Sequence, residues 1–93
     1  MEQKGDRVAR NRPSLEALVA AELRVELARQ GRSRRWLAER TGEPLTTVAR
    51  WVKGTTAPGL DDLEVLAEAL GTSALALVQR AQAAARSASL LSA

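Results

Sequence analysis

The side chains of this 93-residue sequence that are best suited to chemistry are its cations. Twelve arginines and two lysines outnumber 11 acidic residues, which gives a net charge of +3. Residues 32–53 carry a net charge of +4 and residues 1–12 one of +2, whereas residues 60–93 carry −2. Because guanidinium groups donate paired hydrogen bonds to phosphates and bases, this uneven distribution favours a polyanion as the partner.

The residue types that are missing exclude several classes of site. Without Cys or His, the chain lacks a thiol nucleophile, a disulfide framework and the usual ligands of zinc. It also lacks the commonest general base. We interpret the adjacent acids Asp61 and Asp62 as the charged first turn of a helix rather than a catalytic pair. We therefore expect no enzyme, no metal, no cofactor and no small-molecule ligand.

No segment of the chain has the hydrophobicity of a membrane span or of a secretory signal. The longest uninterrupted apolar runs, such as residues 74–78, have five residues, whereas a transmembrane helix needs roughly 20. The first twelve residues contain no apolar core of the kind that signal peptides carry. We expect a cytoplasmic protein with no membrane partner.

Apolar residues recur at helical spacing in five segments, and no segment alternates as a strand does. Ser14 is the expected cap of the first helix, which should end at Gly31. The other helices are expected at Ser33 to Gly42, near Pro44 to Gly54, Leu60 to Gly71, and Thr72 or Ser73 to about Ala88. The sequence therefore predicts an all-α fold of five helices, the last of which is rich in Ala.

The second and third of these helices must cross steeply, because a turn of only three or four residues joins them. Ala38 is small enough for a close approach between helices, and Gly42 tolerates a backbone conformation that other residues resist. On a larger helical scaffold, such a pair can place its second helix in the major groove of DNA.

The segment SRRWLAERTGEPLTTVARWVKG, residues 33–54, resembles the helix-turn-helix of the lambda Cro and repressor family, also called the XRE family. The similarity covers about residues 15–80 and includes Ser33, Leu37, Ala38, Gly42, Val48, Trp51, Gly54, Pro58 and the stretch LEVLAEALG at 63–71. It implies a compact five-helix, lambda-repressor-like domain at 13–80 with its helix-turn-helix core at 33–54. A basic N-terminal arm at 1–12 and a C-terminal helical extension at 81–93 would flank this domain.

The resemblance also implies which residues contact double-stranded DNA. Arg34, Arg35 and Lys53 are expected at phosphates, and Arg34 alternatively at a base edge beside one. The residues expected to face the floor of the groove are Leu45, Thr46, Thr47, Ala49 and Arg50. Of these, Arg50 has the geometry to donate two hydrogen bonds to guanine, and Leu45 and the threonine methyls suit thymine methyls.

Several of these residues have a second interpretation. Leu45 is either groove-facing, which we favour, or buried in the turn. We interpret Trp36 and Trp51 as packed in or against the core rather than as base-stacking platforms. The cations of the arm either enter the minor groove or belong to an extension without a contact; they are Lys4, Arg7, Arg10 and Arg12.

The sequence departs from the family's pattern at three places. Glu43 replaces a small apolar residue of the turn, and Pro44 replaces the Ser or Thr that caps the recognition helix. Pro44 is either the cap of this helix or, since proline suits a first helical position, its first residue, so the register of the helix is open by one residue. Leu27 and Val52 stand where many relatives carry an Arg–Glu ion pair, so both halves of that pair have become apolar.

The last helix carries a heptad-like seam of mostly small residues, formed by Leu77, Ala81, Ala84, Ala88 and Leu91. We expect a homodimer through this helix or the fourth, reading an inverted-repeat operator with half-sites roughly 34 Å apart. In the alternative, the first half of the helix docks on its own domain and the tail frays.

These observations together predict a small, sequence-specific transcriptional regulator of bacterial or bacteriophage origin. Its closest analogue is a Cro-like repressor that occupies an operator with its recognition helix in the major groove. Two alternatives remain open: an antitoxin that uses this helix-turn-helix for autoregulation while binding a toxin, and a helical module that binds only proteins.

Overall fold

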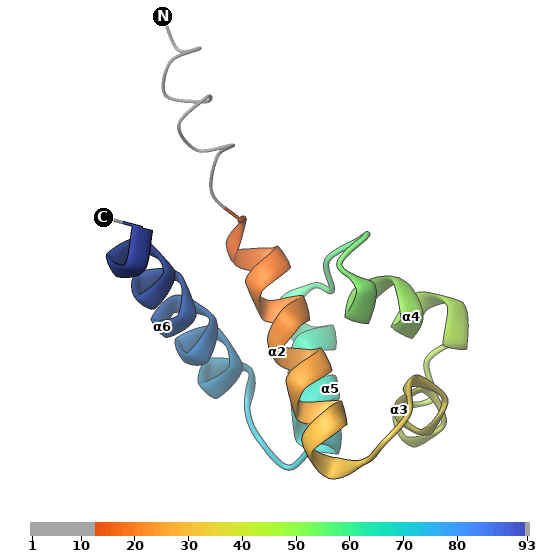
Figure 1. Cartoon of the computed structure of the whole chain (residues 1–93). Helices are drawn as coiled ribbons and strands as arrows, with labels where there is room; N and C mark the ends of the chain where they lie inside the picture. Colours follow the sequence, from red (N-terminus) through yellow and green to blue (C-terminus); the bar gives the residue numbers. More distant parts are fainter. Residues whose placement is uncertain (1–12, 93) are drawn as a thin grey trace, which may run out of the picture.

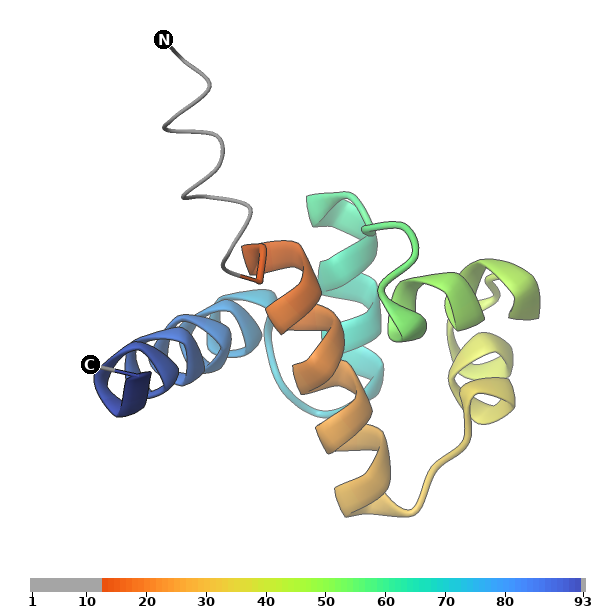
Figure 2. The same ribbon diagram turned by 45° about the horizontal axis from the view of Figure 1, so that its top comes forward.

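The structure, a computed structural model, describes residues 13–92. These residues form five α-helices and no strand, as the sequence predicts: α2 (Leu15–Gln30), α3 (Arg34–Thr41), α4 (Leu45–Lys53), α5 (Leu60–Ala69) and α6 (Ala74–Ser92). In Figures 1 and 2, α6 lies on one side of α2, and α3 and α4 lie on the other. The four cations of the expected N-terminal arm, Lys4, Arg7, Arg10 and Arg12, lie outside the described residues.

Ser14 caps the first helix as predicted, and Ser33, at the expected start of the second helix, caps that helix. Ser14 Oγ accepts a hydrogen bond from the Ala17 amide at 3.0 Å, and Ser33 Oγ accepts one from the Trp36 amide at 3.0 Å. The expected end of the last helix is wrong, because α6 continues to Ser92 instead of stopping near Ala88. Its second half contains neither Gly nor Pro and is rich in Ala, the strongest helix former, so nothing in the sequence ends it earlier.

The hydrophobic core draws on every described helix. Leu23, Leu37, Val48, Leu66 and Leu77 come one from each helix, and none of these side chains has exposed surface. Burying each contributes about 1.5–3 kcal/mol to stability. The helix-turn-helix formed by α3 and α4 is therefore held by a core shared with the other helices as well as by the contacts between α3 and α4.

Both tryptophans belong to this core, as the sequence analysis favours. Trp51 is buried, and Trp36 is half-buried and packs against the core cluster. The Arg32 guanidinium stacks over the Trp36 ring, 4.5 Å from its centre. Such a cation–π contact stabilises by roughly 0.5–1 kcal/mol at an exposed site, and here it covers the outer face of the ring.

One acidic side chain, Glu26 of α2, is buried with only 6% of its surface exposed. Its carboxylate accepts hydrogen bonds from Gln30 Nε2 at 2.9 Å and from Arg80 of α6 at 2.8 Å. Arg29 lies 3.5 Å away, and Gln30 also donates to the Leu70 carbonyl at 2.7 Å. The hydrogen bonds from Gln30 and Arg80 lower the pKa of Glu26 against the opposing effect of burial. Glu26 therefore links α2 to α6, and Gln30 links α2 to the end of α5.

We predict that Glu26→Gln lowers the free energy of unfolding at pH 7 by about 1–2 kcal/mol, the range for a charged hydrogen bond whose partners stay partly solvated. Because folding depresses the pKa of Glu26, its contribution is complete above the unfolded pKa and disappears as the pH falls through the folded pKa. Urea unfolding should show the difference between wild type and variant at pH 7 shrinking towards pH 3. Glu39→Gln, at an exposed site on α3, should change little at either pH. A difference that does not depend on pH would contradict the role of the Glu26 charge.

Candidate nucleic-acid interface

A three-residue turn, 42–44, joins α3 to α4. Gly42 ends α3 with φ 80°, in the left-handed region, and its amide donates to the Ala38 carbonyl at 2.9 Å. A Cβ on Gly42 would meet no atom within 4 Å, so the backbone conformation rather than space requires glycine there. Ala38 itself is buried and belongs to the core cluster.

Helix α4 begins at Leu45, so of the two registers that the sequence leaves open, the one that begins at Pro44 is wrong. Pro44 has φ −61° and ψ 141°, an extended conformation, and occupies the cap position. Its carbonyl accepts the first bond of the helix from the Val48 amide at 3.0 Å. The ring fixes φ, but this ψ lies outside the helical region, so Pro44 directs the chain into α4 without being part of it.

α4 has one buried face and one exposed face. Val48, Trp51 and Val52 are buried in the core. Among the predicted groove-facing residues, Thr46 and Arg50 are exposed, Leu45 is 38% exposed, and Thr47 and Ala49 are half-buried. Leu45 is therefore not buried in the turn. At 100° per residue, Thr46, Ala49, Arg50 and Lys53 lie on one side of the helix, with Leu45 and Thr47 beside them.

The predicted cations of α3 stand at its first turn. Arg34 and Arg35 are both exposed, and no acidic residue accompanies them there. Cations near a helix N-terminus oppose the helix dipole, typically by 0.3–1 kcal/mol each. None of the predicted phosphate contacts, Arg34, Arg35 and Lys53, forms an ion pair within residues 13–92. These charges are consequently available to an external anion.

A helix-turn-helix family model matches residues 21–77, from the middle of α2 into the start of α6. The chain belongs to the XRE-type helix-turn-helix family. It is thus a DNA-binding transcription regulator of the XRE type, and domains of this family bind double-stranded DNA. The family is a regulatory one and not a family of enzymes. No curated protein and no solved structure matches the chain.

The two positions where many XRE relatives carry an ion pair are both in the core here. Leu27 and Val52 are buried, so an apolar contact between α2 and α4 replaces the charged one. A polar contact between these helices lies one turn earlier along α2, where Arg24 donates a hydrogen bond to the Val52 carbonyl at 2.6 Å. This carbonyl belongs to the last turn of α4, where a cation also complements the helix dipole.

Sequence reasoning missed Arg24. Its partner is a backbone carbonyl 28 residues away, so no acidic residue at a matching position could reveal the contact. The only available signal was a basic residue one turn before Leu27. In the XRE fold seen here, this side chain fixes the end of the recognition helix relative to α2.

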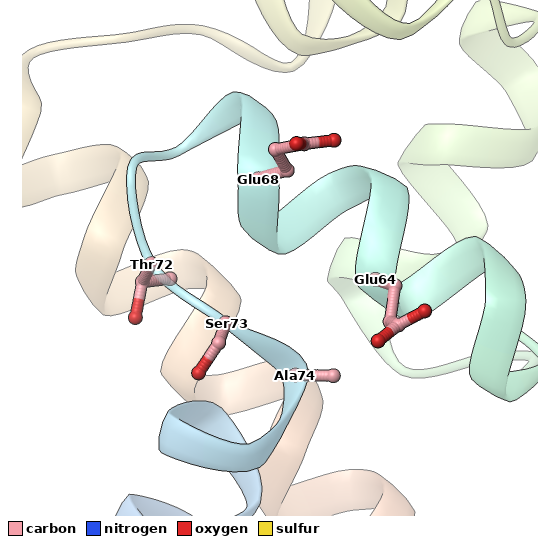
Figure 3. Close-up of a pocket in the computed structure, with 5 residues that line it drawn as sticks. All are labelled: Glu64, Glu68, Thr72, Ser73 and Ala74. Atoms are coloured by element: carbon pink, nitrogen blue, oxygen red, sulfur yellow. The ribbon is translucent and has the colours of Figure 1, made fainter.

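A shallow hollow of about 270 Å³ lies between α5 and the start of α6. Figure 3 shows that the carboxylates of Glu64 and Glu68 point away from the hydroxyls of Thr72 and Ser73, so these groups do not converge. Ser73 Oγ already accepts a hydrogen bond from the Ala76 amide at 3.0 Å. Within residues 13–92, no three acidic side chains gather as a metal ion would require. In the same part of the chain, no helix is long and apolar enough to cross a membrane.

We predict that Arg24→Met lowers the free energy of unfolding by about 1–3 kcal/mol, because the Val52 carbonyl loses a charged donor. Urea unfolding checks this value. The matched control is Arg40→Met: Arg40 is also an exposed helical arginine, but its side chain makes no hydrogen bond or ion pair within the described residues. Equal stability of the two variants would contradict the role of Arg24 in holding α4.

Proposed function

We propose that this XRE-type regulator is a Cro-like repressor that recognises a specific operator with α4 in the major groove. The observation that carries the proposal is the division of α4 into two faces. Val48, Trp51 and Val52 are held in the core, so the opposite side of the helix is presented to solvent in one fixed orientation. Repression then follows from occupying the operator, which needs no further domain.

The exposed face of α4 supplies two kinds of base contact. Arg50 can donate to O6 and N7 of one guanine, which discriminates against other bases by roughly 1–3 kcal/mol. Leu45 and the methyls of Thr46 and Thr47 suit thymine methyls. Ala49 lies among them and is small, so α4 can approach the groove floor closely. These roles assign guanine at one position and thymine at neighbouring positions of each half-site.

Phosphate contacts are proposed for the cations that flank this face. Arg34 and Arg35 at the start of α3, and Lys53 at the end of α4, would hold the protein in register on the duplex. The arm residues Lys4, Arg7, Arg10 and Arg12 are proposed for the adjacent minor groove. Each phosphate contact adds affinity that depends on salt and carries no sequence information.

The proposed operator is an inverted repeat bound by two copies of the chain. One short recognition helix reads only a few base pairs, and a symmetric pair doubles that number with half-sites about one helical turn apart. Since its target is genomic DNA of a bacterium or of an infecting phage, the protein would act in the bacterial cytoplasm.

Selection from a random duplex pool at about 150 mM salt, followed by sequencing, tests this proposal. We expect wild type to enrich an inverted repeat with a guanine in each half-site. Arg50→Ala should lose the preference for that guanine and bind the operator about 5- to 150-fold more weakly. Lys53→Ala, which removes one cation from the same helix, should weaken binding to all sequences alike and reduce the salt slope by about one.

Each other outcome of the selection counts against part of the proposal. Enrichment of a single unrepeated site would contradict two-copy binding. Enrichment of no sequence would contradict the repressor and favour a module that binds only proteins. Equal effects of Arg50→Ala and Lys53→Ala on specificity would remove Arg50 as a base reader.

A further inference from the structure

The end of α4 lies against α2, and Arg24 stands at this contact. A Cβ on Gly54, the residue that follows α4, would lie 3.5 Å from the Ala20 side chain of α2. One turn further along α2, Arg24 Nη1 donates to the Val52 carbonyl in the last turn of α4 at 2.6 Å. The Arg24 guanidinium is thereby held at the residue that precedes Lys53, one of the cations proposed to contact DNA.

Most of the hydrogen-bonding capacity of Arg24 is unused. A guanidinium group has five N–H donors, and the bond to Val52 takes one of them. Arg24 is exposed, and its other donors have no partner within residues 13–92. Because the Val52 carbonyl already fixes the group, a further ligand would meet a donor set that has less conformational freedom left to lose.

No carboxylate within residues 13–92 pairs with Arg24. Residues 44–60, which include α4 and the loop after it, contain no acidic residue. On α2, Glu22 and Glu26 lie two positions before and two after Arg24, and therefore on the opposite side of the helix. The Glu26 carboxylate already has two hydrogen-bond donors of its own. Arg24 and Lys53 thus give the end of α4 a positive charge that suits an external anion.

The length of α4 brings this end of the helix to the edge of the DNA groove. With nine residues, α4 is about 13.5 Å long, whereas the major groove is roughly 12 Å wide. Recognition helices contact base edges with their N-terminal residues. When the exposed face from Leu45 to Arg50 reads bases, the last turn with Val52 and Lys53 therefore lies near the sugar–phosphate backbone. A cation fixed to that turn is then within reach of phosphates.

We infer that Arg24, together with Lys53, binds phosphates of the DNA backbone at the end of α4. Arg24 donates one N–H to the Val52 carbonyl and offers the others to a phosphate, so a single guanidinium joins α2, α4 and the DNA. The inference rests on the proposed binding of DNA by α4 and adds a residue of α2 to that surface. Arg24 acts on affinity and not on the choice of bases, because phosphate contacts carry no sequence information.

The salt dependence of DNA binding tests this site. Dissociation constants of wild type, Arg24→Gln and Arg86→Gln are measured between about 50 mM and about 200 mM salt, on the selected operator and on a duplex of arbitrary sequence. Glutamine is neutral but keeps an N–H donor at position 24. Losing one phosphate contact should reduce the slope of log affinity against log salt by about 0.9. The rise in salt should then weaken wild type about 3.5-fold more than Arg24→Gln.

Arg86→Gln is the matched control, because it removes the same charge from an exposed position of α6, which lies on the other side of α2 from α4 (Figures 1 and 2). Its slope should equal that of wild type. Weaker binding of Arg24→Gln with an unchanged slope would mean that Arg24 only holds α4, and would overturn the inference. An equal loss of slope in both variants would also overturn it, since the position of the charge would then not matter.

A second measurement needs no variant that could fail to fold. The guanidinium ¹⁵N signals of Arg24 in the wild-type chain should shift when a duplex is added, because a phosphate then accepts their hydrogen bonds. Signals of Arg24 that stay unchanged while the backbone amides of α4 shift would overturn the inference.

The two duplexes separate this inference from the proposed function. Since phosphate contacts are independent of sequence, the difference in slope between wild type and Arg24→Gln should occur on both duplexes. A wild type that prefers neither duplex but still shows this difference would contradict the operator-specific repressor and support the phosphate site. A wild type that prefers the operator, with no difference in slope, would overturn the phosphate site alone.

Discussion

The structure depends first on the burial of one side of a nine-residue helix. Val48, Trp51 and Val52 of α4 pack into a core to which the other described helices also contribute. A helix this short has no alternative orientation once three side chains of one face are fixed, because rotating it would expose all three to water. The exposed positions of α4 are therefore set by the core, before any DNA is present.

The remaining features near α4 preserve that orientation from both ends. At its start, Gly42 and Pro44 set the backbone of the turn, and the Pro44 carbonyl accepts the first helical bond. At its end, Arg24 holds the Val52 carbonyl. Glu26 binds its cations inside the α2–α6 contact, whereas the proposed DNA-contacting residues Arg34, Arg50 and Lys53 have no carboxylate partner within residues 13–92. Phosphates would not have to displace an internal ion pair from these cations.

The sequence predicts most of this fold because its helices carry local signals. Ser14 and Ser33 mark two starts, Gly31, Gly42 and Gly54 mark three ends, and apolar spacing identifies the core. The register at Pro44 stays open in the sequence because proline is compatible with both the cap and the first helical position, and only the backbone ψ separates them. Glu26 and Arg80 lie 54 residues apart in the sequence, and their contact depends on how α6 packs against α2. Helical periodicity does not predict that packing. The helices that form the candidate site could be predicted from the sequence. The contact of Arg24 could not, because its partner is a backbone carbonyl.

We propose that the exposed face of α4 and the start of α3 form the DNA-binding surface. Titrating the ¹⁵N-labelled chain with its selected duplex, with amide chemical-shift changes as the readout, tests this proposal. We predict the largest changes at Arg34, Arg35 and residues 45–53, with the amides on the exposed face of α5 unaffected. Changes concentrated on α5 and absent from α4 would contradict it.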